Sequence, residues 1–212
     1  MDSLSSARVI LLNGSPHKEG TTYTALKEVA DALIESGIEA KILHVGGDAH
    51  RGCTACGACK SSGKCVFDDG LNEVADEIAL ADGLVIGSPV YYSSPNGTLL
   101  SFLDRLFYVH SKRFPRMMVG ASVVAARRGG CTATFDALNK YFTISGMPVV
   151  SSCYWNMVHG KCADDAKMDL EGLYTMRTLG LNMAFLIKSI KLGKEAVGLP
   201  EHGERPYTNF IR

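Results

Sequence analysis

Four of the seven cysteines in this chain of 212 residues fall within thirteen positions, in the stretch CTACGACKSSGKC. Two residues separate Cys53 from Cys56 and Cys56 from Cys59, and five separate Cys59 from Cys65. Compact runs of this kind hold iron–sulfur clusters through their thiolates, so we expect a 4Fe–4S cluster on these four residues. Packed thiols without a ligand are the second interpretation. A zinc site is the third, because zinc sites usually separate two cysteine pairs more widely.

A second candidate site is the stretch NGSPHKEGTT at residues 13–22, which joins an apolar strand-like run to a helical pattern. Unpaired N–H groups and the positive end of the dipole make a helix N-terminus a seat for an anion. Gly14 and Gly20 permit close backbone approach, and His17 and Lys18 add positive charge. The glycine spacing fits neither a triphosphate loop nor a dinucleotide motif. We expect a phosphate here, the alternative being a turn that only caps the helix.

Two further loops, GSPVYYSSPNG at 87–97 and ARRGG at 126–130, also follow apolar runs. A rigid loop of prolines and glycines can present its backbone to the edge of a flat heterocycle, while Tyr91 or Tyr92 packs against its face. A guanidinium near the pyrimidine edge of a flavin would stabilise the reduced ring. The alternatives are partly buried core tyrosines and solvated surface arginines.

Strand-like apolar runs alternate with helical patterns along the chain. We predict strands at residues 7–13, 38–45, 83–89, 118–126 and 147–155, and helices with apolar positions in 26–34, 71–78, 99–107, 135–142 and 166–192. Apolar strands separated by amphipathic helices predict an α/β protein with a five-stranded parallel sheet, in a three-layer α/β/α sandwich of flavodoxin-like type. The loops then meet at the carboxyl ends of the strands. We expect residues 1–194 to form this domain, with a cysteine-rich insert at 46–70, and 195–212 to form a C-terminal tail.

One loop on a phosphate and two around an aromatic ring describe a site for flavin mononucleotide (FMN). In order and spacing, the loops resemble those of the NADPH-dependent FMN reductase branch of the flavodoxin-like superfamily, and the likeness covers most of residues 8–190. The cysteine stretch resembles the motif of the iron–sulfur flavoproteins in that branch.

The resemblance implies that the FMN phosphate is held by Ser15, His17, Gly20, Thr21 and Thr22. It implies that the ring is lined by Pro89, Val90, Tyr91, Tyr92 and Ser93, and closed on its third side by Arg127, Arg128, Gly129 and Gly130. His17 and Thr21 replace the arginine and asparagine usual in this phosphate loop. We expect this departure to weaken phosphate binding or make it depend on pH near neutrality.

The resemblance implies an enzyme that takes electrons from NADH or NADPH onto FMN and passes them to a quinone, a flavin, or a nitro or azo compound. The alternative is an electron carrier between ferredoxin-like donors and other acceptors. The resemblance also implies a homodimer or homotetramer. No catalytic side chain is assigned, but Trp155, Asn156 and His159 are candidates for the substrate pocket. The acidic pairs Asp68–Asp69 and Asp164–Asp165 are expected to favour helix starts.

The overall charge argues against nucleic-acid and anionic-membrane partners, because 22 basic residues balance 22 acidic ones and no long basic run is present. The longest apolar stretch, at 117–126, is well short of the ~20 residues that cross a bilayer. The N-terminal residues lack the basic start of a signal peptide. We therefore expect a cytoplasmic protein, in which clustered cysteines bind metal or carry out redox chemistry more often than they form structural disulfides.

Overall fold

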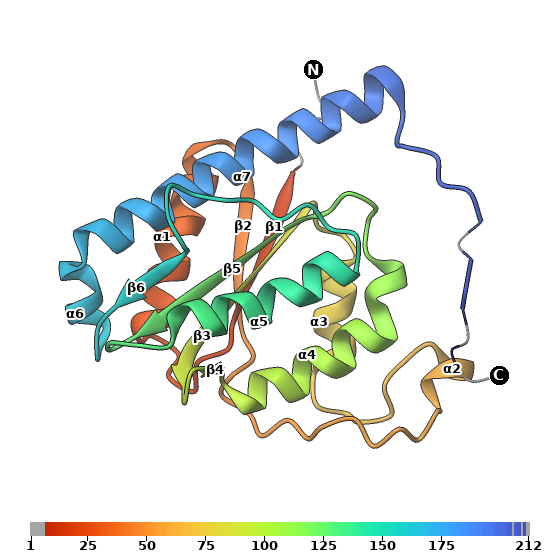
Figure 1. Cartoon of the computed structure of the whole chain (residues 1–212), viewed down its shortest axis with the longest axis horizontal. Coiled ribbons are helices and arrows are strands. Elements are labelled where there is room, and N and C mark those ends of the chain that lie inside the picture. The colour runs from red at the N-terminus through yellow and green to blue at the C-terminus, as the bar shows by residue number, and fades with distance from the viewer. Residues whose placement is uncertain (1–6, 205, 209, 211–212) are drawn as a thin grey trace.

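The computed structural model describes residues 7–204, 206–208 and 210, and shows a sheet with helices on both faces (Figure 1). The parallel strands are β1 (Arg8–Asn13), β2 (Glu39–His44), β3 (Gly83–Tyr91), β5 (Val119–Ala126) and β6 (Met157–His159). They lie in the order β2-β1-β3-β5-β6, which is the flavodoxin-like order. A sixth, two-residue strand, β4 (Ser94–Pro95), pairs antiparallel with the end of β3. The predicted fold is confirmed, with six strands instead of five.

Two groups of helices cover the two faces of this sheet. One face carries α1 (Thr21–Glu35), α6 (Ala163–Met168) and α7 (Leu170–Val197), and the other carries α3 (Leu71–Ile78), α4 (Gly97–His110) and α5 (Cys131–Ile144). A four-residue helix, α2 (Cys59–Ser62), lies in the insert, and a 3-10 turn at Ser111–Arg113 follows α4. Successive residues of a strand point to opposite faces. Leu11 therefore joins the core under α1 and α7, and Leu12 joins the core under α4 and α5.

The fifth parallel strand lies later in the chain than we predicted. Residues 147–155 form no strand, and one isolated bridge joins Val149 to Gly120. The chain then leaves the sheet and returns as β6, which pairs with the last residues of β5. Because an edge strand pairs on one side only, this interruption breaks no second ladder of hydrogen bonds. An apolar run shows that a segment approaches the sheet, but not where it leaves.

Helix α7 continues to Val197, three residues beyond the domain end predicted at residue 194. Asp169 caps its start by accepting a hydrogen bond from the N–H of Gly172 at 2.9 Å. Within the described residues, no helix is both long and apolar enough to cross a bilayer. The division between domain and tail stays a prediction.

Candidate functional site

A cavity of about 970 Å³ opens at the carboxyl ends of β1, β3 and β5. Its walls come from the loop after β1, the ends of β3 and β5, and residues 160–164 after β6. Doubly wound sheets bind ligands at this edge, where the direction of strand succession reverses. The loops that the sequence singles out therefore meet where the fold offers room for a ligand.

Side chains at the base of the loop after β1 hold it in one conformation. Asn13 accepts a hydrogen bond from the N–H of Ser15 (3.1 Å) and donates its amide N–H to the carbonyl of Lys18 (3.0 Å). Ser15 is buried, and its hydroxyl accepts from the N–H of His17 at 3.1 Å. These bonds involve protein groups only, so the loop is shaped by the fold itself.

Neighbouring segments support the same loop from behind. The side chain of Asn96 donates to the carbonyl of Gly14, and Nε2 of His44 lies against the carbonyl of Ser15, both at 2.8 Å. The segment after β2 packs so closely that a Cβ at Gly46 would lie 2.3 Å from the carbonyl carbon of Gly14. A glycine is required there because no real Cβ tolerates such a contact.

The helix that follows this loop, α1, starts without a cap. Its N-cap residue, Gly20, offers no side chain, and its first turn contains no acidic residue. The first N–H groups of a helix have no acceptor within the helix, and the dipole makes this end positive. Thr21 and Thr22 line the cavity at this point, so the geometry suits an anion such as phosphate.

The charged residues on the cavity wall also favour an anion. Lys18, Arg127 and Lys161 contribute positive charge, against Glu19 and Asp164. Asp164 is itself paired with Lys167 at 2.8 Å. Together with the start of α1, the three basic side chains give the cavity the charge that a phosphate ester requires.

The structure brings most of the predicted FMN-site residues together around the cavity. Those that line it are Ser15, His17, Gly20, Thr21, Thr22, Pro89, Val90, Tyr91 and Arg127. Those that do not are Tyr92, Ser93, Arg128, Gly129 and Gly130. All five residues predicted to bind the phosphate therefore line the cavity, whereas the two loops expected around the ring contribute only their first residues. That these residues bind FMN stays a prediction.

Tyr92 and Ser93 instead form the tight turn between β3 and β4. Both have left-handed backbones, with φ of 52° and 59°, where asparagine or glycine is usual. A non-glycine residue held in this region costs about 1 kcal/mol or more, and such strain tends to gather at functional sites. The turn leaves Tyr92 fully exposed. The backbone of the turn packs on Gly130, because a Cβ built at Gly130 would lie 2.9 Å from the Cα of Ser93.

Residues 160–164 form a wall that the sequence did not reveal. The hydroxyl of Thr21 donates to the carbonyl of Gly160 at 3.4 Å, which joins this wall to the start of α1. Lys161 and Cys162 line the cavity. The segment carries no motif, and only its place after the last parallel strand could have indicated it.

All four cysteines of the insert line a second cavity, of about 320 Å³. Its remaining wall is largely apolar and includes Phe67, Tyr108 and Val109. Cys53 and Cys56 are exposed, while Cys59 and Cys65 are half-buried. Left-handed turns at Ala55 and Gly57 curl the segment around the cavity. The sulfur atoms of four cysteines could therefore bind one group held in this cavity.

Within the part of the chain that the structure describes, no three His, Cys, Asp or Glu side chains are placed to hold a single metal ion. This finding bears on the zinc and the 4Fe–4S interpretations alike, because both groups can be held by a set of four cysteine thiolates. Four thiols around one largely apolar cavity have the chemistry of that donor set.

A buried arginine forms part of this second cavity. Arg105, on α4, is 1% exposed, and its Nη1 lies 3.5 Å from the sulfur of Cys65. The guanidinium also donates to both carboxylate oxygens of Asp69, at 3.2 and 2.5 Å. Burial by itself would lower the pKa of Arg105, but its hydrogen bonds with Asp69 and Cys65 hold that pKa above the ordinary value.

Asp69 is the partner of this arginine and not a helix cap. The N-cap of α3 is Gly70, and Asp69 instead bonds to Arg105 and to Nδ1 of buried His50, at 3.2 Å. Partial burial by itself would raise the pKa of Asp69, but the bonds from Arg105 and His50 outweigh it and hold that pKa below its usual range. The prediction for this residue was wrong because its tertiary partner lies 36 residues away.

The backbone of Cys65 is fixed by a second polar group, Asn72. Its side chain accepts from the N–H of Cys65 (3.0 Å) and donates to the carbonyl (2.9 Å). Nε2 of buried His110 lies 3.0 Å from the same oxygen of Asn72, and Nη1 of Arg113 lies 3.2 Å from Nδ1. Because Arg113 only donates, the ring is neutral, with its proton on Nε2. Burial first, and then the charge of Arg113, lowers the pKa of His110.

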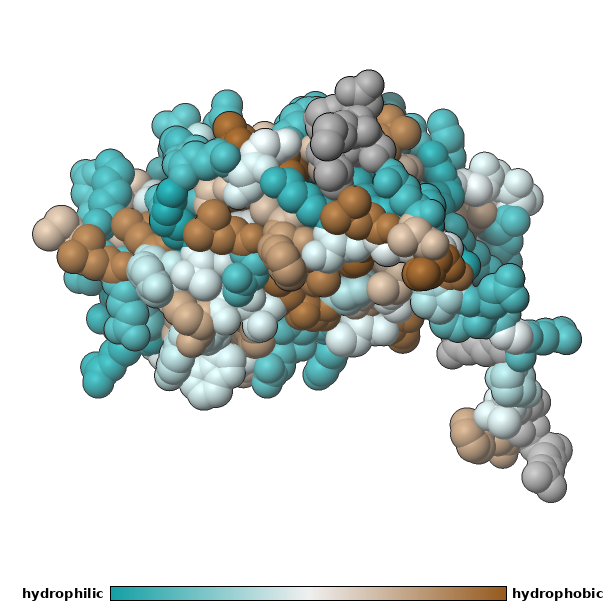
Figure 2. Space-filling view, turned by 90° about the horizontal axis from the view of Figure 1, so that it is seen from above, coloured by the Kyte–Doolittle hydropathy of each residue, from teal (hydrophilic) through white to brown (hydrophobic). Residues whose placement is uncertain are grey.

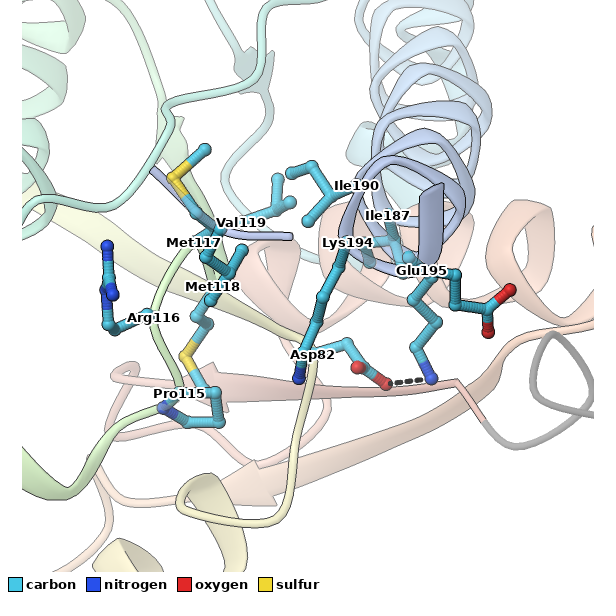
Figure 3. Close-up of a pocket in the computed structure, with 12 residues that line it drawn as sticks. Asp82, Pro115, Arg116, Met117, Met118, Val119, Ile187, Ile190, Lys194 and Glu195 are labelled. Atoms are coloured by element: carbon cyan, nitrogen blue, oxygen red, sulfur yellow. Dashed lines mark ion pairs between the residues drawn. The ribbon is translucent and has the colours of Figure 1, made fainter. Parts of the chain in front are cut away.

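Further cavities lie apart from these sites. Figure 3 shows one of about 430 Å³, between α7 and residues 115–119, where Lys191 pairs with Asp82 at 3.2 Å. It lies at the amino ends of β3 and β5, opposite the cavity at the carboxyl ends of the strands. Trp155 and His159 line another, of about 250 Å³, beside the start of α7. Asn156 is buried and donates to the carbonyl of Ser122 at 3.0 Å, so it lines neither.

Comparison with known proteins agrees with the geometry of the larger site. The family model for NADPH-dependent FMN reductases matches residues 7–161. The chain belongs to this family. It is 34% identical over 191 residues to an iron-sulfur flavoprotein of Methanocaldococcus jannaschii, which covers 87% of this chain and 99% of that relative. As a member of the family, the chain is an FMN-dependent oxidoreductase.

Solved structures show the same fold at low sequence identity. The crystal structure of RosB with bound 8-demethyl-8-formylriboflavin-5'-phosphate matches with a TM-score of 0.70 and 14% identity, over 98% of this chain and 94% of that one. An NAD(P)H:quinone oxidoreductase from Methanothermobacter marburgensis matches with a TM-score of 0.63 and 17% identity, over 84% and 97% of the two chains. These likenesses show that the chain has the fold of those proteins.

Proposed function

We propose that this chain oxidises NADH or NADPH and delivers the electrons, through FMN bound in the larger cavity, to a quinone, a flavin, or a nitro or azo compound. One observation carries the proposal: an uncapped helix start and the ends of β1, β3 and β5 converge on one cavity of about 970 Å³. Bound FMN would supply the capacity to accept two electrons from a nicotinamide and release them to a second acceptor.

The phosphate loop would bind and orient the FMN. The N–H groups at the start of α1 and the hydroxyls of Thr21 and Thr22 are the groups that would hold the phosphate. Lys18 and Lys161 would add charge from opposite walls. Because Asn13 and Asn96 already hold the loop, little ordering entropy would oppose binding.

The ends of β3 and β5 would hold the ring. Pro89, Val90 and Tyr91 would cover it with apolar surface and exclude water, while Arg127 would place a positive charge near it. Tyr92, fully exposed on its strained turn, would offer an aromatic face to an incoming nicotinamide or acceptor. No side chain is assigned as a proton donor.

We also propose a 4Fe–4S cluster on Cys53, Cys56, Cys59 and Cys65. The support is the single cavity that these four thiols share, and the family relative in M. jannaschii that is named an iron-sulfur flavoprotein. Such a cluster would pass electrons one at a time. Since cytosolic thiols are kept reduced, the proposal also favours a cytoplasmic location.

A carrier function is the second candidate, favoured by the surroundings of the cysteine cavity. Cys53 and Cys56 are exposed, and so are the basic residues Arg51, Lys60 and Lys64 of the same insert. These basic side chains would attract an acidic, ferredoxin-like donor toward the cavity, although Asp48 and Asp68 of the insert are exposed as well. In that case the chain would pass electrons between proteins and turn over no small molecule.

We propose a homodimer formed through α7. Five apolar residues lie along one stripe of this helix, each at least 45% exposed: Leu170, Tyr174, Leu181, Phe185 and Leu192. At 100° per residue they fall within about 60° of arc. Figure 2 shows this face of the molecule, with hydrophobic side chains in a band bordered by hydrophilic ones.

The spacing of the residues in the stripe is nearly symmetric about one position of α7. This symmetry favours a second copy of the chain as the partner. Tyr174 and Leu192 lie equally far from Met183, as do Leu181 and Phe185. Two antiparallel α7 helices related by a twofold axis would therefore meet apolar against apolar along the stripe. Sedimentation should show a dimer that dissociates in Leu181→Glu/Phe185→Glu. A monomeric wild-type chain would contradict this interface.

Steady-state kinetics separates the enzyme from the carrier. Anaerobically purified protein should consume NADPH or NADH continuously when a small quinone is supplied, at a rate proportional to the amount of FMN-loaded protein. A single stoichiometric reduction of the bound FMN, followed by no turnover with any of the proposed acceptor classes, would favour the carrier.

A further inference from the structure

We propose that Arg105 is a positioning residue of the cysteine cavity, which fixes the sulfur of Cys65 and raises the reduction potential of the cluster held there. The inference rests on the proposed cluster but not on the identity of the electron acceptor. It assigns a role to a side chain that lies outside both the cysteine motif and the FMN loops.

The guanidinium of Arg105 can act on a group in the cavity because it is aligned by other residues. Asp69 receives two of its hydrogen bonds, and Asp69 is in turn held by buried His50, whose Nε2 lies 2.9 Å from the carbonyl of Val45. Nη1, which makes one of the bonds to Asp69, also lies 3.5 Å from the sulfur of Cys65. The arginine is thus set in place before any cluster is present.

One donor of Arg105 has no hydrogen-bond partner in the described part of the chain. Its Nε is buried without a hydrogen-bond acceptor among the described residues. A buried unpaired donor costs roughly 1–3 kcal/mol in general and more when it is charged, so such an atom in a native protein needs an explanation. Arg105 lines the cysteine cavity, and an anionic sulfur atom there would supply the missing acceptor.

The other three cysteines are not held in this way. Cys53 and Cys56 are exposed. Within the described part of the chain, the one hydrogen bond to a sulfur among the three is from the N–H of Ala55 to Cys53, at 3.4 Å. Cys65 alone has its backbone fixed by Asn72 and its sulfur beside a buried cation. We infer that Cys65 is the fixed ligand, that Cys59 is held by the short helix α2, and that Cys53 and Cys56 close on the cluster from the exposed segment.

Arg105 then affects the chemistry of the cluster through its charge and its hydrogen bonds. Reduction adds one negative charge to an iron–sulfur cluster, and hydrogen bonds to its sulfur atoms stabilise that charge. Because Arg105 is buried, water screens its interaction little. Removing the guanidinium should therefore make the cluster harder to reduce.

The test compares wild-type protein with Arg105→Met and Arg105→Lys, each purified without oxygen. The control is Arg177→Met, which removes an arginine paired with Glu28 and Glu35 on the opposite face of the sheet. Three quantities are measured: FMN per chain, the reduction potential of the cluster, and the half-time of iron release to a chelator. FMN content reports on the fold and on the proposed function independently of the cysteines.

In Arg105→Met we expect normal FMN content, a lower reduction potential and iron release that is faster by about 10-fold, as is typical when the outer shell of a metal site is removed. Arg105→Lys keeps the positive charge but loses the planar guanidinium. Its reduction potential and its rate of iron release should therefore lie between those of Arg105→Met and the wild type. Arg177→Met should match the wild type. If Arg105→Met fails to fold, the reduction potential and iron release of Arg105→Lys still test the inference.

An unchanged potential and release rate in a folded Arg105 variant would overturn the inference while leaving the oxidoreductase intact. Wild-type protein that binds FMN but never iron would overturn it together with the cluster. Wild-type protein that binds iron but not FMN would instead refute the proposed flavin site and leave the role of Arg105 to be judged by the potential.

Discussion

The phosphate loop and the cysteine insert both project from the carboxyl edge of the sheet, yet they are ordered by different means. The phosphate loop begins at a central strand, and Asn13, His44 and Asn96 bond to its backbone. Among the residues that the structure describes, the one hydrogen bond made by residues 51–56 of the insert joins the N–H of Ala55 to the sulfur of Cys53. One site is therefore shaped by the fold. The other is fixed at Cys65 and in helix α2, and under the proposed cluster Cys53 and Cys56 would be ordered by what they bind.

The largest effect is expected when the contact between Asp69 and Arg105, which attaches the insert to α4, is removed. Asp69→Ala would leave the charge of Arg105 buried and unpaired, so we expect a loss of about 3 kcal/mol in unfolding free energy. Urea unfolding of the protein without cofactors measures it. The control is Asp76→Ala, which removes a solvent-exposed partner of Arg113 and should change stability little. Equal effects of the two substitutions would show that the Arg105 pair does not anchor the insert.

Hydrogen exchange of the protein without cofactors compares the two regions directly. Amides of residues 52–56 should exchange roughly 100-fold faster than those of residues 13–15, because the latter are held in the sheet and loop network. Assembly of a cluster should slow exchange in 52–56 and leave 13–15 unchanged. Strong protection of 52–56 before any metal is added would show that the insert, too, is ordered by the fold.

Gly46→Ala tests how tightly the phosphate loop is packed. The new Cβ would collide with the backbone of Gly14, so we expect a loss of about 1–3 kcal/mol in stability and weaker FMN binding. Gly52→Ala is the matched control, because a Cβ there meets nothing within 4 Å. FMN titration of both variants, followed by flavin fluorescence, gives the comparison. Identical affinities would mean that the packing behind the loop is unimportant for binding.

The smallest expected effect is a dependence of stability on pH through His110. Its pKa is lowered in the folded chain, so below about pH 6.5 the unfolded chain binds this proton more readily than the folded one. Stability should therefore fall as the pH decreases from 7 toward 5. His110→Gln, which can still donate to Asn72, should reduce this slope. An unchanged slope would assign the acid sensitivity to other groups.

The sequence predicted strands best where a continuous apolar run alone determined that a segment was a buried strand. Continuous apolar runs located β1, β3 and β5, since central parallel strands are buried on both faces. The edge strand β2 was located from a run of mixed polarity. The fifth strand was misplaced because residues 147–155 are apolar and yet pair with the sheet at one bridge only. Apolar composition cannot show that an edge segment leaves the sheet before residue 157.

The candidate site was predictable where function depends on local turns. The loop at residues 13–22 shows its glycines and hydroxyls in the sequence itself. Arg105 could not be found in this way, because an arginine within an amphipathic helix is usually solvated and its partners Cys65 and Asp69 are remote in sequence. The same holds for the wall at residues 160–164, which only the sheet topology brings to the cavity.

The most direct test of the account is an FMN titration of the protein stripped of cofactors, followed by anaerobic addition of NADPH or NADH. The account predicts that each chain takes up one FMN with quenching of its fluorescence, and that the nicotinamide then bleaches the flavin absorbance at 450 nm or close to it, as for flavins generally. A colourless protein that takes up no FMN would contradict the flavin site at the ends of β1, β3 and β5, whatever the four cysteines bind.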